Sequence, residues 1–205
     1  MSTCKEEHLG LARQMLMYLD GTINDKLIFR QAGCDGSTKA DVSLLSFSDS
    51  DWACAIDKRR SHGCHFLMFE GAAIRWRSKS PKSVMLSTAA VEYYEASEAC
   101  REIAFVQGIL EDFYGGALIP TPLFIDNEAA IVMGKLPQFT ERQKHIPIRI
   151  CHLKECAADK LVELRPIPTR NEFADIGTKA LAFPCFQRLK DVLIGKVRFS
   201  ILLHT

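Results

Sequence analysis

Residues 44–54 read Leu-Leu-Ser-Phe-Ser-Asp-Ser-Asp-Trp-Ala-Cys, a strand pattern whose apolar face becomes acidic at its end. A period of two places Leu45, Phe47, Asp49 and Asp51 on one face of that strand. A carboxylate in a core position costs free energy unless it is paired or coordinated. The stretch therefore predicts a buried strand that carries acids to one rim of a sheet.

The rest of the chain predicts a sheet around this strand. Two strands follow it, over 64–70 and 73–78, and Glu70-Gly71 supplies a hairpin turn between them, which favours an antiparallel meander. Two more strands are expected over 122–126 and 161–167. Helices are expected over 88–113, 127–134, 142–159 with an interruption near Pro147, and 184–195. Thr169–Glu172 matches a capping box, which predicts a helix start near residue 170. The order β-β-β-α-β-α-β-α indicates an α/β fold, a five-stranded mixed sheet flanked by helices.

The N-terminal residues are expected to form a separate part. Residues 6–19 have the apolar spacing of a helix that ends at Asp20-Gly21, and a short strand is expected over 27–29. Residues 31–41 are small and polar, as in a linker. The domain organisation predicted is therefore a connecting region over 1–41 and a main domain over 42–205.

Length and composition exclude several classes of protein. A chain of 205 residues is too short for a complete polymerase, and 47% hydrophobic with 25% charged residues is typical of a folded globular protein. The net charge of +1 argues against a polyanion binder that is basic throughout. The eight cysteines are scattered, as reduced thiols of an intracellular protein are. Without an apolar run of membrane-spanning length or a signal core, we expect a soluble protein that is not secreted.

Three further acids stand at the ends of predicted elements. Glu92 shares a helical face with apolar residues, Asp126 closes the run 122–126, and Asp175 lies early in a late helix. Each alone also fits a structural role, a helix dipole for Glu92 and Asp175 or turn chemistry for Asp126. Together with Asp49 they can converge on one rim, where mutual repulsion requires cations. Two Mg²⁺ ions about 3.5–4 Å apart would suit such a cluster and the hydrolysis of a phosphodiester.

Six blocks of the sequence, in order across 47–181, resemble the ribonuclease H domain of Copia-type retrotransposon Pol polyproteins. The blocks are Phe47–Ala53, Asp57–Ser61, Leu86–Thr88 with Val91–Tyr93, Asp126–Ile131, Lys144–Ile146 and Ala174–Leu181. Upstream, His8-Leu9, Tyr18–Thr22 and Leu27 resemble the segment that joins reverse transcriptase to ribonuclease H in that family.

This resemblance implies a ribonuclease H-like fold and an endonuclease that cuts the RNA strand of RNA–DNA hybrids with two Mg²⁺ ions or with Mn²⁺. The family's catalytic and metal-binding acids fall on Asp49, Glu92, Asp126 and Asp175. The implied partners are an RNA–DNA hybrid and the reverse-transcriptase domain of the same polyprotein, with no membrane. The implied location is intracellular, in the cytoplasm, including virus-like particles, or in the nucleus.

The sequence departs from the family pattern at three places. Ala90 replaces an acid two residues before Glu92, and residues 166–170 lack the histidine that cellular ribonucleases H carry before Asn-Glu. Gly177 and Ala180 stand where the family usually has a larger residue and a proline. These departures leave an alternative open, a decayed or domesticated module that binds nucleic acid without cleaving it. A third alternative is another two-metal nuclease, such as an exonuclease.

Two basic bands favour nucleic-acid binding. Residues 57–82 contain seven Lys/Arg against two acids, and residues 142–170 contain seven against three. The alternative is a solvated hairpin face. The contact residues predicted from these bands and from the family blocks are Lys58, Arg59, Arg60, Arg75, Arg77, Lys79, Asn127 and Lys144. Trp76 is expected either in the core or on a sugar-stacking surface.

Zinc binding is not expected at the two groups of cysteines and histidines. Neither group contains a paired Cys-x-x-Cys knuckle. One group is Cys151, His152 and Cys156, and the other is His62, Cys64 and His65. His145 is expected to be a structural or nucleic-acid contact.

Overall fold

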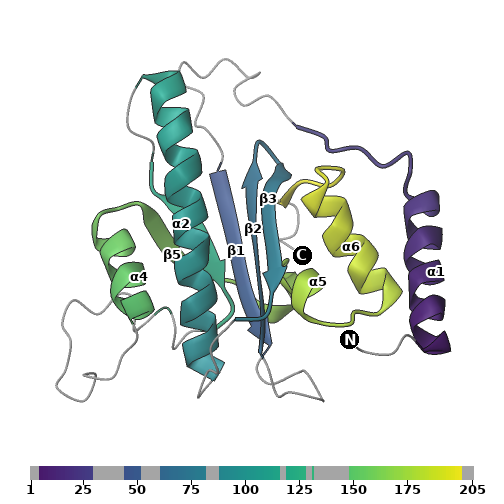
Figure 1. Cartoon of the computed structure of the whole chain (residues 1–205). Helices are drawn as coiled ribbons and strands as arrows, with labels where there is room; N and C mark the ends of the chain where they lie inside the picture. Colours follow the sequence, from purple (N-terminus) through teal and green to yellow (C-terminus); the bar gives the residue numbers. More distant parts are fainter. Residues whose placement is uncertain are drawn as a thin grey trace.

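The computed structural model has a five-stranded mixed sheet in the order β3-β2-β1-β4-β5 (Figure 1). The residues that the structure describes are 5–29, 44–51, 61–81, 88–115, 119–127, 131 and 148–199. The strands are β1 Leu44–Asp51, β2 His62–Phe69, β3 Ala72–Lys79, β4 Thr121–Ile125 and β5 Val162–Pro166. The predicted fold class, a mixed sheet of five strands with flanking helices, is confirmed.

β1, β2 and β3 form the antiparallel meander expected from the sequence. The hairpin between β2 and β3 turns at Glu70 and Gly71, both with positive φ, 48° and 86°. β4 runs parallel to β1, and β5 runs parallel to β4. Because β1 and β4 are parallel neighbours, the residues that follow their carboxyl ends lie at the same rim of the sheet.

Helices cover both faces of this sheet. On one face, α2 (Thr88–Tyr114) and α4 (Ile148–Ala158) enclose a core that includes Ile103, Leu123 and Leu153. On the other, α6 (Phe183–Leu193) covers a core built around Phe47. The ring of Phe47 stacks on Phe124 at 5.1 Å and meets Phe173 edge to face at 4.8 Å between centroids. The end of β1 is therefore held in a rigid aromatic core.

The last rim elements differ from the capping box that the sequence suggested. A 3₁₀ turn η2 (Thr169–Asn171) comes first, and the four-residue helix α5 (Asp175–Thr178) follows it. Glu172 is fully buried and its Oε1 accepts a hydrogen bond from the Ala174 backbone N–H at 2.9 Å. A helical turn does begin near residue 170, but it is a single 3₁₀ turn without the expected capping box, because the Glu172 side chain is buried and bonds to Ala174 instead.

The N-terminal helix α1 (Glu6–Gly21) lies at the edge of the molecule, beside α6 (Figure 1). Tyr18 meets Phe186 at 5.8 Å between ring centroids, and the Ile28 N–H donates to the Ile194 carbonyl at 2.8 Å. The expected strand over 27–29 is not formed. The hydrogen bond of Ile28 goes to the end of α6 and not to a neighbouring strand. The whole of the expected linker over 31–41 lies outside the described residues. The boundary between the two predicted domains therefore stays a prediction.

Other expected elements are only partly described. Of the helix expected over 127–134, Ile131 is helical and its N–H donates to the Asn127 carbonyl at 3.3 Å. The part of 142–159 before Ile148 lies outside the described residues. Among the helices described, none is long and apolar enough to cross a membrane.

Candidate functional site

Asp49 lies at the acidic end of β1 and is 4% exposed. The alternation of β1 directs it to the same side as Phe47, as the sequence indicated. Its Oδ2 accepts a hydrogen bond from the Thr178 hydroxyl at 2.5 Å, across 129 residues of chain. The Lys179 ammonium lies 3.5 Å from the same oxygen. The short helix α5 is thus attached to the end of β1.

Asp175 begins α5 and faces the same ammonium. Lys179 Nζ lies 2.5 Å from Asp175 Oδ1, so one side-chain cation contacts both Asp49 and Asp175. Burial raises the pKa of Asp175 and the charge of Asp49 adds to this shift, while the hydrogen bond and the charge of Lys179 oppose it; together these effects bring the pKa to about 6. Burial lowers the pKa of Lys179, but Asp175, Asp49 and Asp126 outweigh it and the net shift is upward.

Glu92, near the start of α2, has a carboxylate with a hydrogen bond to only one of its two oxygens. Its Oε2 is buried and has no hydrogen-bond partner. Burial raises the pKa of Glu92, and the charges of Asp126 and Asp49 raise it further, whereas the hydrogen bond with Asn127 and the charge of Lys179 lower it; together these effects bring the pKa to about 7. Glu92 therefore lies close to two other acids, on the core-facing side of α2 that the helical periodicity predicted.

Asp126 follows the end of β4, directly after Ile125. Burial raises its pKa, the charge of Asp49 raises it further, and Lys179 opposes the shift. Asp49 thus perturbs the three other predicted acids, Glu92, Asp126 and Asp175. The structure places Asp49 within electrostatic reach of each of the other three acids, while the role of all four as ligands stays a prediction.

The chemistry of this cluster suits a hard divalent cation. Four carboxylates offer only oxygen donors, and the buried Glu92 Oε2 has a lone pair free for one. Within the described ranges, no three Asp, Glu, His or Cys side chains are placed so that they could hold one ion together. The Lys179 ammonium contacts two of the acids instead. The donor types therefore suit a hard cation, but among the described residues the acids do not surround one common position.

Three residues of this neighbourhood were missed from the sequence. Thr178 and Lys179 were seen only as part of a motif, because nothing in local spacing reveals a contact with Asp49. Glu172 is fully buried beneath the cluster, and its pKa is raised well above the usual range by burial and by Asp49, Asp126 and Asp175. The sequence offered one sign that Thr178, Lys179 and Glu172 belong to the site, namely that all three lie within four residues of Asp175.

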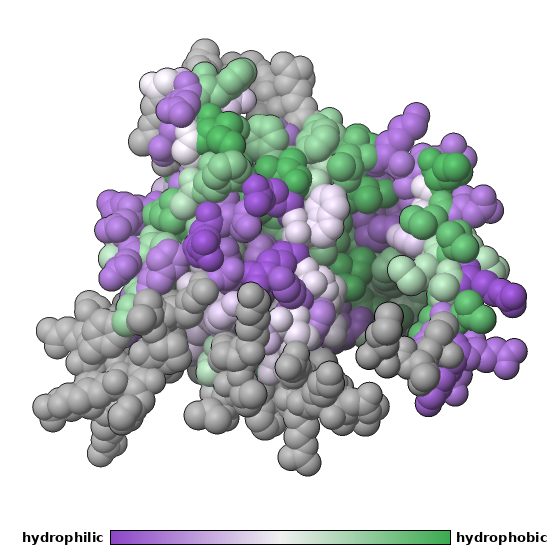
Figure 2. All heavy atoms as spheres, in the orientation of Figure 1, coloured by the Kyte–Doolittle hydropathy of each residue, from purple (hydrophilic) through white to green (hydrophobic). Residues whose placement is uncertain are grey.

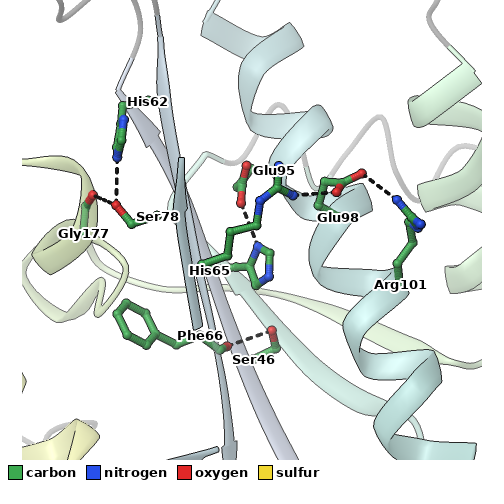
Figure 3. Close-up of polar contacts among 10 residues, drawn as sticks. Ser46, His62, His65, Phe66, Ser78, Glu95, Glu98, Arg101 and Gly177 are labelled. Atoms are coloured by element: carbon green, nitrogen blue, oxygen red, sulfur yellow. Dashed lines mark hydrogen bonds and ion pairs between the residues drawn. The ribbon is translucent and has the colours of Figure 1, made fainter. Parts of the chain in front are cut away.

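A second missed feature is a buried hydrogen bond between a histidine of β2 and a glutamate of α2 (Figure 3). His65 Nδ1 lies 2.7 Å from Glu95 Oε1, and both side chains are 1% exposed. Gly63 makes room for it, since a Cβ on Gly63 would lie 2.3 Å from Glu95 Oε2. Glu95 lies one turn beyond Glu92, at the margin of the predicted core face.

The predicted basic surface is partly engaged in ion pairs. Arg75 lies 2.5 Å from Glu102, and Arg77 lies 2.5 Å from Glu98, which also receives Arg101 (Figure 3). Glu98 thus receives one arginine from β3 and one from α2 itself.

Other predicted contacts have different outcomes. Lys79 is exposed at the end of β3, and Trp76 is 62% exposed, which excludes the core alternative for that ring. Asn127 hydrogen-bonds Glu92. The remaining predicted contact residues and His145 lie outside the described residues, namely Lys58, Arg59, Arg60 and Lys144.

Gly177 has a packing reason that the sequence could not supply. Its carbonyl accepts a hydrogen bond from the Ser78 hydroxyl at 2.7 Å (Figure 3), and a Cβ there would lie 2.3 Å from Cys64 Sγ. A larger residue would push α5 away from β2 and β3. In this chain, the packing around residue 177 therefore leaves room only for glycine, which accounts for the departure from the family pattern there.

Comparisons with known proteins relate this chain to transposon polyproteins. No family model matches the chain. It is 31% identical over 188 residues to the retrovirus-related Pol polyprotein from transposon TNT 1-94 of Nicotiana tabacum, which covers 92% of this chain and 14% of that protein. It is 28% identical over 182 residues to the corresponding polyprotein from transposon RE1 of Arabidopsis thaliana, covering 89% of this chain and 12% of that protein.

The structural neighbours are ribonuclease H domains. One is the N-terminal RNase H domain of a Mycobacterium tuberculosis protein, solved as a fusion with maltose-binding protein. It has a TM-score of 0.49 at 8% identity and covers 73% of this chain and 97% of that chain. The present chain spans about an eighth of the length of the polyproteins that it matches by sequence. Over about nine tenths of its length, the chain is therefore similar to one segment of the retrovirus-related Pol polyproteins of plant transposons.

Proposed function

We propose that this chain is a Copia-type ribonuclease H domain that hydrolyses the RNA strand of RNA–DNA hybrids during retrotransposon reverse transcription. The observation that carries the proposal is the cluster at the ends of β1 and β4, where Asp49 raises the pKa of Glu92, Asp126 and Asp175. Four acids gathered in this way destabilise the fold, and a function that uses their charge accounts for them.

Each residue would have a distinct part in the reaction. Asp49, Glu92, Asp126 and Asp175 would hold two Mg²⁺ or Mn²⁺ ions, which supply Lewis-acid activation of water and of the scissile phosphate when bound. Asn127 orients Glu92 through its hydrogen bond. Thr178 orients Asp49. Lys179 neutralises Asp49 and Asp175 before metal binding and would then be free to meet a phosphate.

Substrate grip would come from the basic residues around this rim. Lys79 is exposed at the end of β3, and Lys58, Arg59, Arg60 and Lys144 are proposed on sequence alone. Arg75 and Arg77 already have carboxylate partners, so a phosphate there would replace Glu102 or Glu98. Binding would then depend on backbone contacts and fall with rising salt. The reverse-transcriptase part of a polyprotein is the proposed partner for substrate positioning.

A module that binds hybrids without cutting them is the second candidate. The contact of Lys179 with both Asp49 and Asp175 favours it, because a protein cation there does part of the work of a metal. This candidate retains the fold and the basic surface but not turnover.

Cleavage of an RNA–DNA hybrid separates these functions. The RNA strand is labelled at one end and incubated with the protein and Mg²⁺ or Mn²⁺, alongside Asp126→Asn and the exposed control Asp112→Asn. We expect internal cuts that Asp126→Asn reduces at least about a hundredfold and Asp112→Asn leaves unchanged. Binding at low salt without cuts would favour the second candidate, and trimming of DNA from its ends would indicate an exonuclease.

A further inference from the structure

A chain of four polar side chains joins α2 to α4, beyond Glu92 along α2. Cys100 and Ser97 project from α2, and His152 and Cys156 lie one turn apart on α4. His152 Nε2 lies 3.5 Å from Cys156 Sγ, and its Nδ1 lies 2.9 Å from Ser97 Oγ. Cys156 and Cys100 hydrogen-bond to each other through their side chains. Neither thiol forms a disulfide.

The two thiols are not equivalent. Cys100 is fully buried, and the hydrogen bond with Cys156, together with burial, raises its pKa. The same hydrogen bond lowers the pKa of Cys156, which is 6% exposed and borders the half-buried His152. A thiol beside an imidazole and a hydrogen-bond donor has thiolate character, and the thiolate is the reactive form of cysteine. The arrangement resembles a nucleophilic cysteine with a resolving cysteine beside it.

We propose that Cys156 and Cys100 form a redox site that reacts with hydroperoxides and closes to a disulfide between α4 and α2. The Cys156 thiol gives its proton to His152 Nε2, the resulting thiolate sulfur attacks one peroxide oxygen, and the imidazolium later returns the proton to the leaving oxygen. The O–O bond breaks, Cys156 becomes a sulfenic acid, and the leaving oxygen departs as water or alcohol with a proton. The Cys100 sulfur then attacks the Cys156 sulfur, and the S–O bond breaks. Water leaves with the Cys100 proton, so two thiols are oxidised as one peroxide is reduced.

The consequence is a reversible covalent link between two helices that otherwise contact through their side chains. Leu153 and Ile103 pack in the same core cluster as the two cysteines, so the link would form inside an already assembled interface. Thiol reductants would restore the free pair. This site is independent of the proposed nuclease activity, because none of its four residues belongs to the acidic cluster.

The test is oxidation of the reduced full chain with hydrogen peroxide. Remaining thiols are blocked with N-ethylmaleimide, and disulfide-linked peptides are mapped by mass spectrometry without reduction. We expect a Cys100–Cys156 link and a loss of two hydrogens. In Cys100→Ser, we expect a dimedone adduct on Cys156. Cys185→Ser, which removes a half-buried thiol on α6, should behave as the unchanged protein.

The role of His152 gives an independent measurement. His152→Ala should slow formation of the Cys156 sulfenic acid about tenfold, the change expected when a thiol pKa rises by one unit. Oxidation that falls first on the half-buried Cys151, or a link between other cysteines, would overturn the proposal. So would an unchanged rate in His152→Ala. The disulfide mapping is made on the unchanged protein. It therefore tests the proposal even if one of the variants fails to fold.

Discussion

At the scale of single residues, the acidic rim is a place where the chain gives up stability. Glu92 has one buried oxygen without a partner, and the charges of Asp126 and Asp49 act on its carboxylate. Folding alone would favour an amide or an apolar side chain in that position. Two substitutions measure this cost in the protein without metal.

Glu92→Gln should change how stability depends on pH. The pKa of Glu92 rises from 4.5 to about 7 in the folded chain, mainly by burial and also by Asp126 and Asp49, against Asn127 and Lys179. The folded state therefore holds its proton more tightly, so the stabilising effect of protonation is complete below about pH 4.5. It is lost as the pH rises to about 7. At pH 8 in EDTA, Glu92→Gln should raise the free energy of unfolding by about 1–2 kcal/mol.

Urea denaturation at pH 5 and pH 8 measures this effect. The exposed control Glu155→Gln on α4 should follow the unchanged protein at both values. If Glu92→Gln kept the full loss of stability between the two pH values, the carboxylate of Glu92 would not be its source.

Lys179→Met should show how much the ammonium stabilises the acids. Lys179 contacts Asp175 at 2.5 Å and Asp49 at 3.5 Å, and Asp49 is 4% exposed. Removing one partner of a buried charge leaves the other uncompensated, so a loss of about 1–3 kcal/mol at pH 7 is expected. The control Lys196→Met removes a mostly exposed cation and should cost less than about 0.5 kcal/mol.

Added Mg²⁺ gives the second half of that experiment. Thermal unfolding with and without the ion should show a larger stabilisation of Lys179→Met than of the unchanged protein, since the ion and the ammonium compete for the same oxygens. Equal stabilisation of both proteins would contradict a shared position for Lys179 and the metal.

At the scale of elements, the fit of α5 against β2 depends on a glycine. A Cβ on Gly177 would lie 2.3 Å from Cys64 Sγ and 3.4 Å from the Ser78 Cβ. Gly177→Ala should therefore destabilise the protein by about 1–3 kcal/mol, the usual cost of overpacking. The matched control is Gly108→Ala at an exposed position of α2, where a Cβ would have nothing within 4 Å. It should raise the free energy of unfolding by about 0.5–1 kcal/mol, because alanine has the higher helix propensity.

A double substitution tests the cause. Cys64→Ala removes the sulfur that the new methyl group meets, so Gly177→Ala with Cys64→Ala should cost less than the sum of the two single changes. Additive costs would show that the strain at Gly177 comes from another neighbour.

The elements themselves were largely predictable from local pattern. Alternation in β1, β2 and β3 and the turn at Glu70-Gly71 are properties of neighbouring residues, so the meander could be predicted. The ends of α2 could be predicted for the same reason, since Gly115 at φ 73° ends it and its N–H donates to Glu111. The capping box failed because Glu172 is taken into the core by elements that are distant in sequence.

Side-chain partners across elements could not be predicted in the same way. His65 and Glu95 are 30 residues apart, and neither has a local pattern that indicates burial as a pair. Asp49, Glu92 and Asp126 were found because each interrupts or ends an apolar pattern, and Asp175 was found from its place early in a late helix and from the family motif, whereas Lys179 has no such signal. Periodicity therefore reveals which residues are out of place but not which residues compensate them.

At the scale of the whole molecule, the rim exists only when the sheet is complete. Asp49 and Thr178 are 129 residues apart, and the parallel pairing of β1 with β4 brings the Asp126 position beside them. The sequence predicted the convergence through the order of the elements, since a strand that follows a long helix can pair in parallel with β1.

The N-terminal helix is attached much less firmly than this core. α1 has no buried residue. Its large apolar side chains, which Figure 2 shows gathered at one edge of the molecule, are 45–74% exposed: Leu9, Leu11, Met15, Leu16, Met17, Tyr18 and Leu19. Its attachment includes the Tyr18–Phe186 contact, the bond from Ile28 to Ile194 and the 2.6 Å ion pair of Asp25 with Lys190. A helix of 16 residues is marginal in water without packing.

Hydrogen exchange should therefore divide the molecule into two parts. We expect the backbone amides of α1 to exchange at least about a hundredfold faster than those of α2, because α1 can open without exposing a core. Peptide-resolved exchange at pH 7 measures this, with α6 as the internal control for the element against which α1 lies. Protection of α1 equal to that of α2 would contradict the prediction. Repeating the exchange at a tenfold lower protein concentration would then show whether a second copy covers the apolar side chains, since that protection would fall on dilution.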